Sequence, residues 1–337
     1  MTDDQPNVSR RSFLERLALL GGIPILDKAA ALAGGKNAAR PAPERDAAGR
    51  AAAAGPAERM SPARPLGKTG HSPCLFSLGG QATIEQDDRR GDAVAIVERA
   101  LDLGVNYVDT APAYGPSQDF IGEVMAARRG EVFLASKTHD RSRDGSLRLL
   151  DDSLRRLRTD HLDLWQLHNL THMSDLDAIF ARGGAIHAME TARADGRVRF
   201  LGLTGHFDPA VLVEGIRRFP FDNVLCALNP ADRFRKSFIE TLLPVATERG
   251  MGIVGMKVPA RGRIFRKGGI ETMRDAMGYV LSLPVSTVII GCSTIAEVEE
   301  NVAIAKAWTR FATEEMARLE LLAEPYHKDA CFFKGWA

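Results

Sequence analysis

The sequence predicts an α/β chain whose main part folds as a single (β/α)8 barrel. Short β-rich segments alternate strictly with longer segments of helical periodicity, and eight such pairs follow residue 63. About 275 residues remain from that point, and an eight-stranded barrel takes about 250. A doubly wound open sheet is the alternative, but no G-x-G-x-x-G motif opens the first strand–helix turn.

The expected strands are short runs rich in β-branched and aromatic residues. They cover 72–80, 105–110, 131–137, 162–168, 197–205, 223–228, 252–257 and 285–291. The first ends at the glycine pair Gly79 and Gly80. Strict alternation with helices argues for parallel strands, and eight parallel strands close a TIM barrel.

The expected helices have apolar residues at helical spacing. They cover 91–104, 117–130, 146–160, 175–194, 208–219, 235–250, 271–283 and 294–308, and a further helix covers 313–324. We expect Gly104 to end the first helix and Ser146 to cap the third at its N-terminus.

The composition is that of an ordinary soluble globular protein. Apolar residues make up 45% of the chain and the net charge is +1. This balance argues against nucleic-acid binding, and no apolar run is long enough to span a membrane. The cysteines are scattered without a metal-binding spacing and are expected to be buried thiols: Cys74, Cys226, Cys292 and Cys331.

Residues 1–33 are expected to be a twin-arginine export signal. Arg10 and Arg11 precede a Phe-Leu pair and a mildly apolar stretch, and the small residues 31–33 offer a cleavage site. The alternative is an amphipathic N-terminal helix. Residues 34–62, rich in Ala, Gly, Pro and Arg, are expected to be a flexible, disordered linker. The expected partner is the twin-arginine machinery, with export to the periplasm and no stable membrane insertion after processing; otherwise the protein is cytoplasmic.

Polar side chains stand where the expected strands end. Asp109, Lys137 and His168 end the second, third and fourth strands, and Tyr114 follows in the loop after Asp109. Active sites of such barrels lie at the carboxyl ends of the strands, so the fold is expected to bring these four together. Polar residues also stand at or just after the ends of the later strands: Thr204, His206, Asn229, Lys257 and Ser293.

The four residues form a set suited to proton donation. A tyrosine has a reference pKa of about 10, and an ammonium beside it favours the phenolate and lowers that pKa. Asp109 can hold Lys137 in place, while His168 can bind a substrate oxygen beside the Tyr114 hydroxyl. Such a set can protonate a carbonyl that accepts hydride and stabilise the charge growing on its oxygen. The hydride must come from a nicotinamide cofactor.

A metal-dependent isomerase or hydrolase is a different candidate, with His168, His206 and Asp109 as ligands. Metal sites usually gather more carboxylates and histidines than these strand ends offer. No metal is therefore expected.

From about residue 63 to residue 310 the chain resembles the aldo-keto reductases, and "GLTGHFDP", "ALNPADRFRKSF" and "GMKV" resemble a little-characterised bacterial branch of that family. "VDTAPAYG" is similar to their Asp-plus-Tyr signature, "VFLASKTH" to their lysine strand and "LDLWQLH" to their histidine strand. The resemblance implies reduction of a small-molecule carbonyl to an alcohol, or the reverse. It implies that Tyr114 is the general acid, that Lys137 and Asp109 adjust the pKa of Tyr114, and that His168 orients the substrate.

The resemblance also implies a nicotinamide cofactor, with NADP(H) favoured and NAD(H) as the alternative. "IIGCSTIAEVEENV" is similar to the family's cofactor-phosphate segment, where a helix N-terminus can hold phosphate. The expected cofactor contacts are Gly80, Thr204, His206, Asn229, Met256, Lys257, Gly291, Ser293 and Asn301.

The chain departs from the family pattern around the expected cofactor. Thr204 and Gly205 stand for Ser-Asn, Leu225 for a Gln, Met256 for an aromatic residue, and Ser293 or Thr294 for a basic residue. Arg261, Arg263 or Lys267 are candidates to reach the phosphates instead. These changes keep a second function open, a nucleotide-binding but catalytically inactive barrel that acts as a sensor or interaction subunit.

The last residues, 311–337, are expected to form a helix and a tail packed on the barrel. This aromatic-rich tail either closes over the substrate mouth or packs against the barrel exterior or an oligomer interface.

Overall fold

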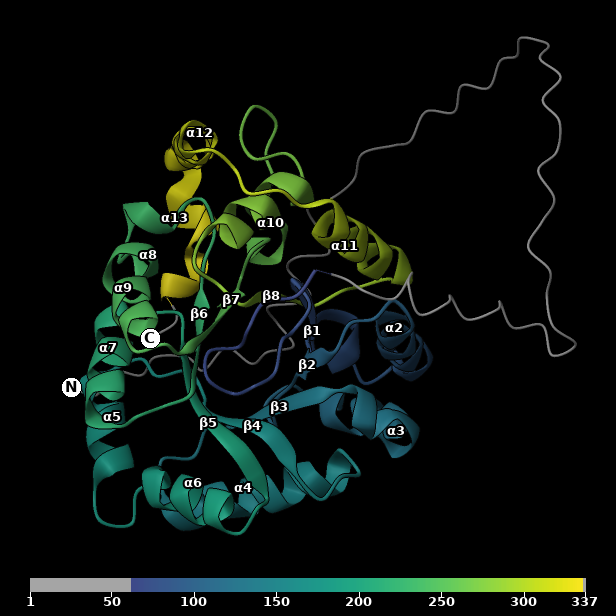
Figure 1. Ribbon diagram of the computed structural model, residues 1–337, viewed down its shortest axis with the longest axis vertical. Helices are drawn as coiled ribbons and strands as arrows, with labels where there is room; N and C mark the ends of the chain where they lie inside the picture. The colour runs from purple at the N-terminus through teal and green to yellow at the C-terminus, as the bar shows by residue number, and fades with distance from the viewer. Residues whose placement is uncertain (1–61, 336–337) are drawn as a thin grey trace, which may run out of the picture. The chain divides into compact units, whose positions relative to one another are not determined.

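Eight parallel strands close into a barrel in chain order, with β8 hydrogen-bonded back to β1 (Figure 1). This computed structural model describes residues 62–335. The strands are β1 Phe76–Gly79, β2 Tyr107–Asp109, β3 Phe133–Thr138, β4 Leu162–Leu167, β5 Val198–Gly205, β6 Asn223–Ala227, β7 Gly252–Met256 and β8 Thr287–Ile290. The (β/α)8 prediction is confirmed. The expected signal over 1–33, and nearly all of the expected linker over 34–62, lie outside the described residues.

Helices surround the barrel (Figure 1). They are α2 Arg90–Asp102, α3 Ser117–Arg128, α4 Arg143–Arg156, α5 Met173–Phe180, α6 Ala185–Ala194, α7 Pro209–Arg218, α8 Phe238–Thr241, α9 Leu243–Glu248, α10 Met273–Ser282, α11 Ile295–Ala307, α12 Thr313–Ala323 and α13 His327–Ala330. Short 3₁₀ turns include η1 Ala82–Glu85, η3 Asp232–Phe234, η4 Ala260–Gly262 and η6 Phe332–Gly335. In the described part of the chain, no helix is apolar over a length that would cross a membrane.

Two of the expected helices are each divided in two. The helix expected over 175–194 breaks between α5 and α6, where Gly183 adopts a φ of 81°. A side chain at Gly184 would bring its Cβ to 2.1 Å from the carbonyl oxygen of Ile179. The helix expected over 235–250 breaks between α8 and α9 because Pro244 lacks the N–H that a continuous helix needs.

The two expected helix caps differ in outcome. Gly104 follows α2 with a φ of 89° and donates its N–H to Leu101, as a glycine helix end does. The N-cap of α4 is Ser142 rather than Ser146, because the Ser142 hydroxyl accepts the N–H of Gly145. Ser146 lies inside the helix, where its buried hydroxyl donates to the carbonyl of Asp140.

The barrel interior is apolar near the amino ends of the strands. Alternate strand residues point inward, and together with Leu66 they form a buried cluster of Tyr107, Phe133, Ala135, Leu164, Leu225, Val254 and Ile289. Leu66 comes from the segment before β1 and contributes to this end; a Cβ at Gly252 would lie 2.8 Å from its Cδ1. Burying each large apolar side chain contributes roughly 1.5–3 kcal/mol. The packed amino end leaves the carboxyl ends of the strands as the place for polar chemistry.

Candidate active site

The barrel brings Asp109, Lys137, Tyr114 and His168 together at the carboxyl ends of β2, β3 and β4. The Lys137 ammonium forms an ion pair with the Asp109 carboxylate and donates to the carbonyl of Thr110 over 2.9 Å. The Tyr114 hydroxyl lies 3.5 Å from Nε2 of His168. Nζ of Lys137 lies 4.8 Å from the centre of the Tyr114 ring. The four residues predicted from strand ends therefore occupy one site.

Close approach of the first two strands positions the loop that carries Tyr114. The N–H of Gly80 donates to the carbonyl of Asp109 over 2.7 Å. A Cβ at Gly80 would lie 2.5 Å from Oγ of Ser117, so glycine is needed there. Gly115 follows Tyr114 with a φ of 49° and packs against the backbone of Glu85. These two close approaches fix the loop in which Tyr114 lines the cavity.

Gln166 is a member of this site that the sequence analysis missed. Its Nε2 donates to the second carboxylate oxygen of Asp109 over 2.9 Å, and its side chain is fully buried. It lies two residues before His168, so strand alternation places both on the inner face. The sequence signal for Gln166 is its spacing: a polar residue two positions before a histidine at the end of a strand faces the same side as that histidine.

Burial and the ion pair act in opposite directions on Asp109 and Lys137. Burial raises the pKa of Asp109 above its ordinary value, although Lys137 and Gln166 pull it down. Burial alone would lower the pKa of Lys137, but the Asp109 carboxylate and the Tyr114 oxygen raise it above the ordinary value. Lys137 is therefore a fixed cation at neutral pH.

The proton donors at the site are neutral. Burial raises the pKa of Tyr114, and Lys137 offsets only part of that shift. This direction is opposite to the expected lowering, because desolvation of the phenolate outweighs its attraction to Lys137. Burial and the nearby Lys137 cation hold the pKa of His168 well below its usual range. Tyr114 therefore carries its proton at neutral pH, while His168 is an uncharged imidazole.

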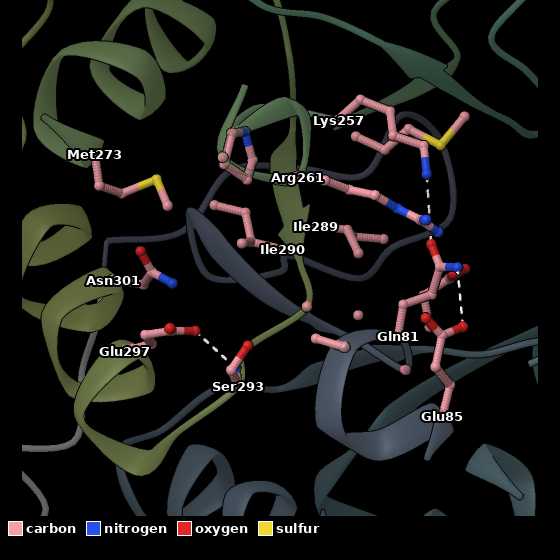
Figure 2. A pocket seen from close by; sticks show the side chains of 18 of the residues that line it. Gln81, Glu85, Lys257, Arg261, Met273, Ile289, Ile290, Ser293, Glu297 and Asn301 are labelled. Atoms are coloured by element: carbon pink, nitrogen blue, oxygen red, sulfur yellow. Dashed lines mark hydrogen bonds between the residues drawn. The ribbon is translucent and has the colours of Figure 1, made fainter. Parts of the chain in front are cut away.

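A cavity of about 540 Å³ opens beside these residues (Figure 2). Asp109 and Tyr114 line it, and so do six of the nine residues expected to contact a cofactor: Gly80, Met256, Lys257, Gly291, Ser293 and Asn301. Its volume lies within the range of about 300–1,000 Å³ for small-molecule sites. Leu225 and Met256, two of the departures from the family pattern, form part of its apolar wall.

A positively charged segment after β7 borders this cavity. Lys257 and Arg261 both line it. Lys257, Ala260 and Arg261 all adopt positive φ, at 61°, 48° and 53°. Such backbone strain tends to gather at functional sites. Burial and the charge of Arg261 lower the pKa of Lys257 to about 8.

Gln81 connects this segment with Glu85 of η1, on the same side of the cavity. Its Oε1 accepts from Nζ of Lys257 over 3.4 Å, while its Nε2 donates to Glu85 over 3.1 Å (Figure 2). Gln81 and Glu85 were not among the expected site residues, because a loop glutamine and glutamate carry no periodic signal.

Another wall of the cavity is formed by the start of α11 and the residues just before it. Ser293, Glu297, Glu300 and Asn301 line the cavity. The side chain of Thr294 caps the helix by accepting from the N–H of Glu297 over 3.2 Å. The N–H of Ser293 donates over 2.6 Å to the Glu297 carboxylate (Figure 2). Gly291 passes close to Gln81, since a Cβ there would lie 3.0 Å from the Gln81 carbonyl oxygen.

Three expected cofactor residues do not line the cavity. Thr204 accepts the backbone N–H of Asn169 over 3.1 Å. His206 is hydrogen-bonded to the carbonyl of Phe333 over 3.2 Å, and burial together with the Lys257 charge lowers its pKa to about 4. Asn229 donates to the carbonyl of Ala330 over 3.1 Å. His206 and Asn229 thus hold the C-terminal segment at the mouths of β5 and β6.

Residues 62–335 contain neither a cluster suited to a metal nor a disulfide. In that range no three His, Cys, Asp or Glu side chains gather as a metal site would need. The four cysteines are buried there and form no disulfide, as expected.

Comparison with known proteins agrees with this architecture. The model of the aldo/keto reductase family matches residues 76–272, which is more than half of the chain. An uncharacterized oxidoreductase of Bacillus subtilis, YqkF, is 26% identical over 301 residues, which cover 75% of this chain and 94% of that protein. The L-galactose dehydrogenase of Arabidopsis thaliana is 25% identical over 304 residues, covering 78% of this chain and 94% of that protein.

A solved structure gives the same result. The holo form of an aldo-keto reductase from Bacillus halodurans is 26% identical, with a TM-score of 0.67, and the match covers 79% of this chain and 97% of that one. The chain belongs to the aldo/keto reductase family and is an oxidoreductase.

Proposed function

We propose that this protein reduces a carbonyl to an alcohol, or catalyses the reverse reaction, with a nicotinamide dinucleotide as cofactor. One observation carries the proposal. Tyr114 and Asp109 line the same cavity as the cations Lys257 and Arg261, so a proton donor and a phosphate-binding segment share one space.

The donor set of the cavity suits a dinucleotide. Lys257 and Arg261 would hold the pyrophosphate, because they are the Lys and Arg side chains lining the cavity within the described chain. Leu225, Met256 and Ile289 offer an apolar surface for a ring. When bound, the cofactor supplies the hydride that no side chain can provide.

The side chains would supply the proton and the electrostatic environment. Tyr114 donates its hydroxyl proton to the carbonyl oxygen, and its raised pKa keeps that proton in place until charge develops. Lys137, fixed by Asp109, lies over the Tyr114 ring and stabilises the phenolate that remains. His168 is uncharged and close to the Tyr114 hydroxyl, so it can bind the same substrate oxygen and orient it.

The first experiment is a fluorescence titration of the full chain with NADH and NADPH, for the wild type and Tyr114→Phe. We expect at least one nucleotide to bind both proteins equally well, and a carbonyl panel to show turnover by the wild type alone. The proposal fails if neither nucleotide binds a protein shown to carry no retained cofactor. Binding without turnover of any carbonyl or alcohol would instead support the inactive sensor.

We also propose that residues 1–33 direct the protein to the periplasm by the twin-arginine route. The proposal is supported by the order of the arginine pair, the apolar stretch and the small residues in that segment. This route carries folded proteins, and NADPH is not regenerated outside the cytoplasm. We therefore expect a tightly retained cofactor, or one cycled between two substrates. Fractionation of cells expressing the Arg10→Lys/Arg11→Lys variant tests the route, and nucleotide analysis of the purified protein tests retention.

A further inference from the structure

The walls of the cavity differ in charge. Lys257 and Arg261, the cations, come from the segment after β7. The wall formed by α11 and the residue Ser293 before it contributes Ser293, Glu297, Glu300 and Asn301, which include two carboxylates and no cation. Figure 2 shows Glu297 and Asn301 on the side opposite Glu85 and Lys257.

This arrangement gives a bound dinucleotide a direction. Its nicotinamide end must lie next to Tyr114, because reacting atoms must approach to about 3–3.5 Å. The loop of Tyr114 packs against Glu85 through Gly115, and Glu85 lies on the side of the cavity away from α11 (Figure 2). With the pyrophosphate at Lys257 and Arg261, the adenosine end extends toward the acidic wall.

The start of α11 is poorly suited to an additional phosphate. A helix N-terminus attracts anions through its unpaired N–H groups, but the N–H of Ser293 already donates to the Glu297 carboxylate over 2.6 Å. The Thr294 hydroxyl accepts the backbone N–H of Glu297, and this hydrogen bond holds the backbone of Glu297 in the first turn of α11. The protein's own carboxylate therefore occupies part of the anion position.

We propose that this cavity selects NAD(H) and rejects NADP(H), with Glu297 and Glu300 as the specificity-determining residues. The inference rests on the proposed function. A carboxylate can accept a hydrogen bond from the ribose 2′-hydroxyl of NAD(H), whereas the 2′-phosphate of NADP(H) usually needs an arginine. A phosphate ester carries a charge of about −1.5 to −2 at neutral pH. Two carboxylates beside it are expected to weaken binding about tenfold or more.

The inference reverses the cofactor preference given by the family resemblance. That preference follows from the resemblance of the chain as a whole, although Ser293 or Thr294 stands where the family often has a basic residue. The structure adds that Glu297 and Glu300 line the cavity, which periodicity could not show.

The test is a titration of the full chain with NADH and with NADPH. Binding is measured by fluorescence and, independently, by calorimetry. We expect the wild type to bind NADH at least about tenfold more tightly than NADPH. Glu300→Arg should shift the ratio toward NADPH by about tenfold or more, and Glu297→Gln should shift it less. High salt should reduce the wild-type preference, because screening weakens repulsion at an exposed wall.

Glu299→Arg is the matched control. Glu299 lies on the same helix but pairs with Arg99 and does not line the cavity. The same charge change there should leave the ratio unaltered. The inference is overturned, while the proposed function stands, if the wild type binds NADPH as tightly as NADH or more tightly. The same holds if Glu299→Arg shifts the NADH-to-NADPH affinity ratio as much as Glu300→Arg does. Failure to bind either nucleotide overturns the proposed function as well.

Discussion

The ammonium of Lys137 and the carboxylate of Asp109 form an ion pair sealed inside the barrel, with side chains only 1% and 4% exposed. Each group offsets the cost of burying the other. Removing one partner from such a pair leaves an uncompensated charge and typically costs about 3–5 kcal/mol. The pair therefore links the stability of the barrel to the chemistry at its mouth.

We expect Lys137→Met to lower both stability and turnover. The free energy of unfolding should fall by about 3 kcal/mol, as measured by urea denaturation at pH 7. Turnover should fall by about 10²–10⁴-fold, because Tyr114 loses the cation that stabilises its phenolate. Lys68→Met, at an exposed position, is the control and should change neither. Near-normal turnover by Lys137→Met would contradict the proposed role.

We expect Gln166→Met to have a smaller effect than Lys137→Met. The change removes one donor to Asp109 and should cost about 1–3 kcal/mol of unfolding free energy, together with a loss of turnover. Gln118→Met is the matched control, because Gln118 is equally buried but donates to Ser136 and Ser153. It should cost similar stability and leave turnover almost intact. Equal turnover losses in the two variants would mean that Gln166 acts only through packing.

Cofactor binding should weaken at alkaline pH. The pKa of Lys257 is about 8, so its positive charge is present below pH 8 and is lost as the pH rises through that value. A bound pyrophosphate favours the charged form, so the dissociation constant should rise above pH 8 by up to about tenfold per pH unit. Titrations of NADH between about pH 6.5 and 9.5 measure this profile.

Two variants isolate the contribution of Lys257 to that profile. Lys257→Arg keeps its charge throughout the range and should give a flat profile. Lys257→Met should bind weakly at every pH. A wild-type profile that is itself flat, or one that Lys257→Arg leaves unchanged, would show that another group sets the pH dependence.

Lys334 fastens the C-terminal segment to the barrel mouth. It is fully buried, and its Nζ contacts the Asp232 carboxylate at 2.5 Å and the carbonyl oxygens of Arg235 and Lys236 at 2.6 and 3.0 Å. We expect Lys334→Met to lower the free energy of unfolding by about 3 kcal/mol, because Asp232 stays buried without its partner. Faster proteolysis near the C-terminus should accompany the loss.

A second change tests that explanation. Adding Asp232→Asn should restore part of the stability, because it removes the uncompensated carboxylate. Lys328→Met on α13, at an exposed position, should cost little. A cost for Lys328→Met as large as that of Lys334→Met would rule out the buried pair as the cause.

Much of the barrel and of its site could be read from local sequence patterns. Strand and helix periodicities repeat within a few residues, so the eight strand–helix units could be predicted in order, although two helices were expected to be longer than they are. The barrel rule then placed Asp109, Lys137 and His168 at neighbouring strand mouths with Tyr114 beside them. These are properties of chain order and of the two-residue alternation of strands.

Tertiary structure alone decided which polar groups share a space. Gln81 meets Lys257 across 176 residues of chain, and Lys334 meets Asp232 across 102. No local period relates residues so far apart. The net direction of the Tyr114 pKa also depended on how deeply the fold buries the ring, a balance between desolvation and one nearby cation. The sequence by itself determined the order of the strands and the residues at their ends. Only the folded structure decided which charged side chains line each wall of the cavity, because electrostatic contacts depend on distance in space.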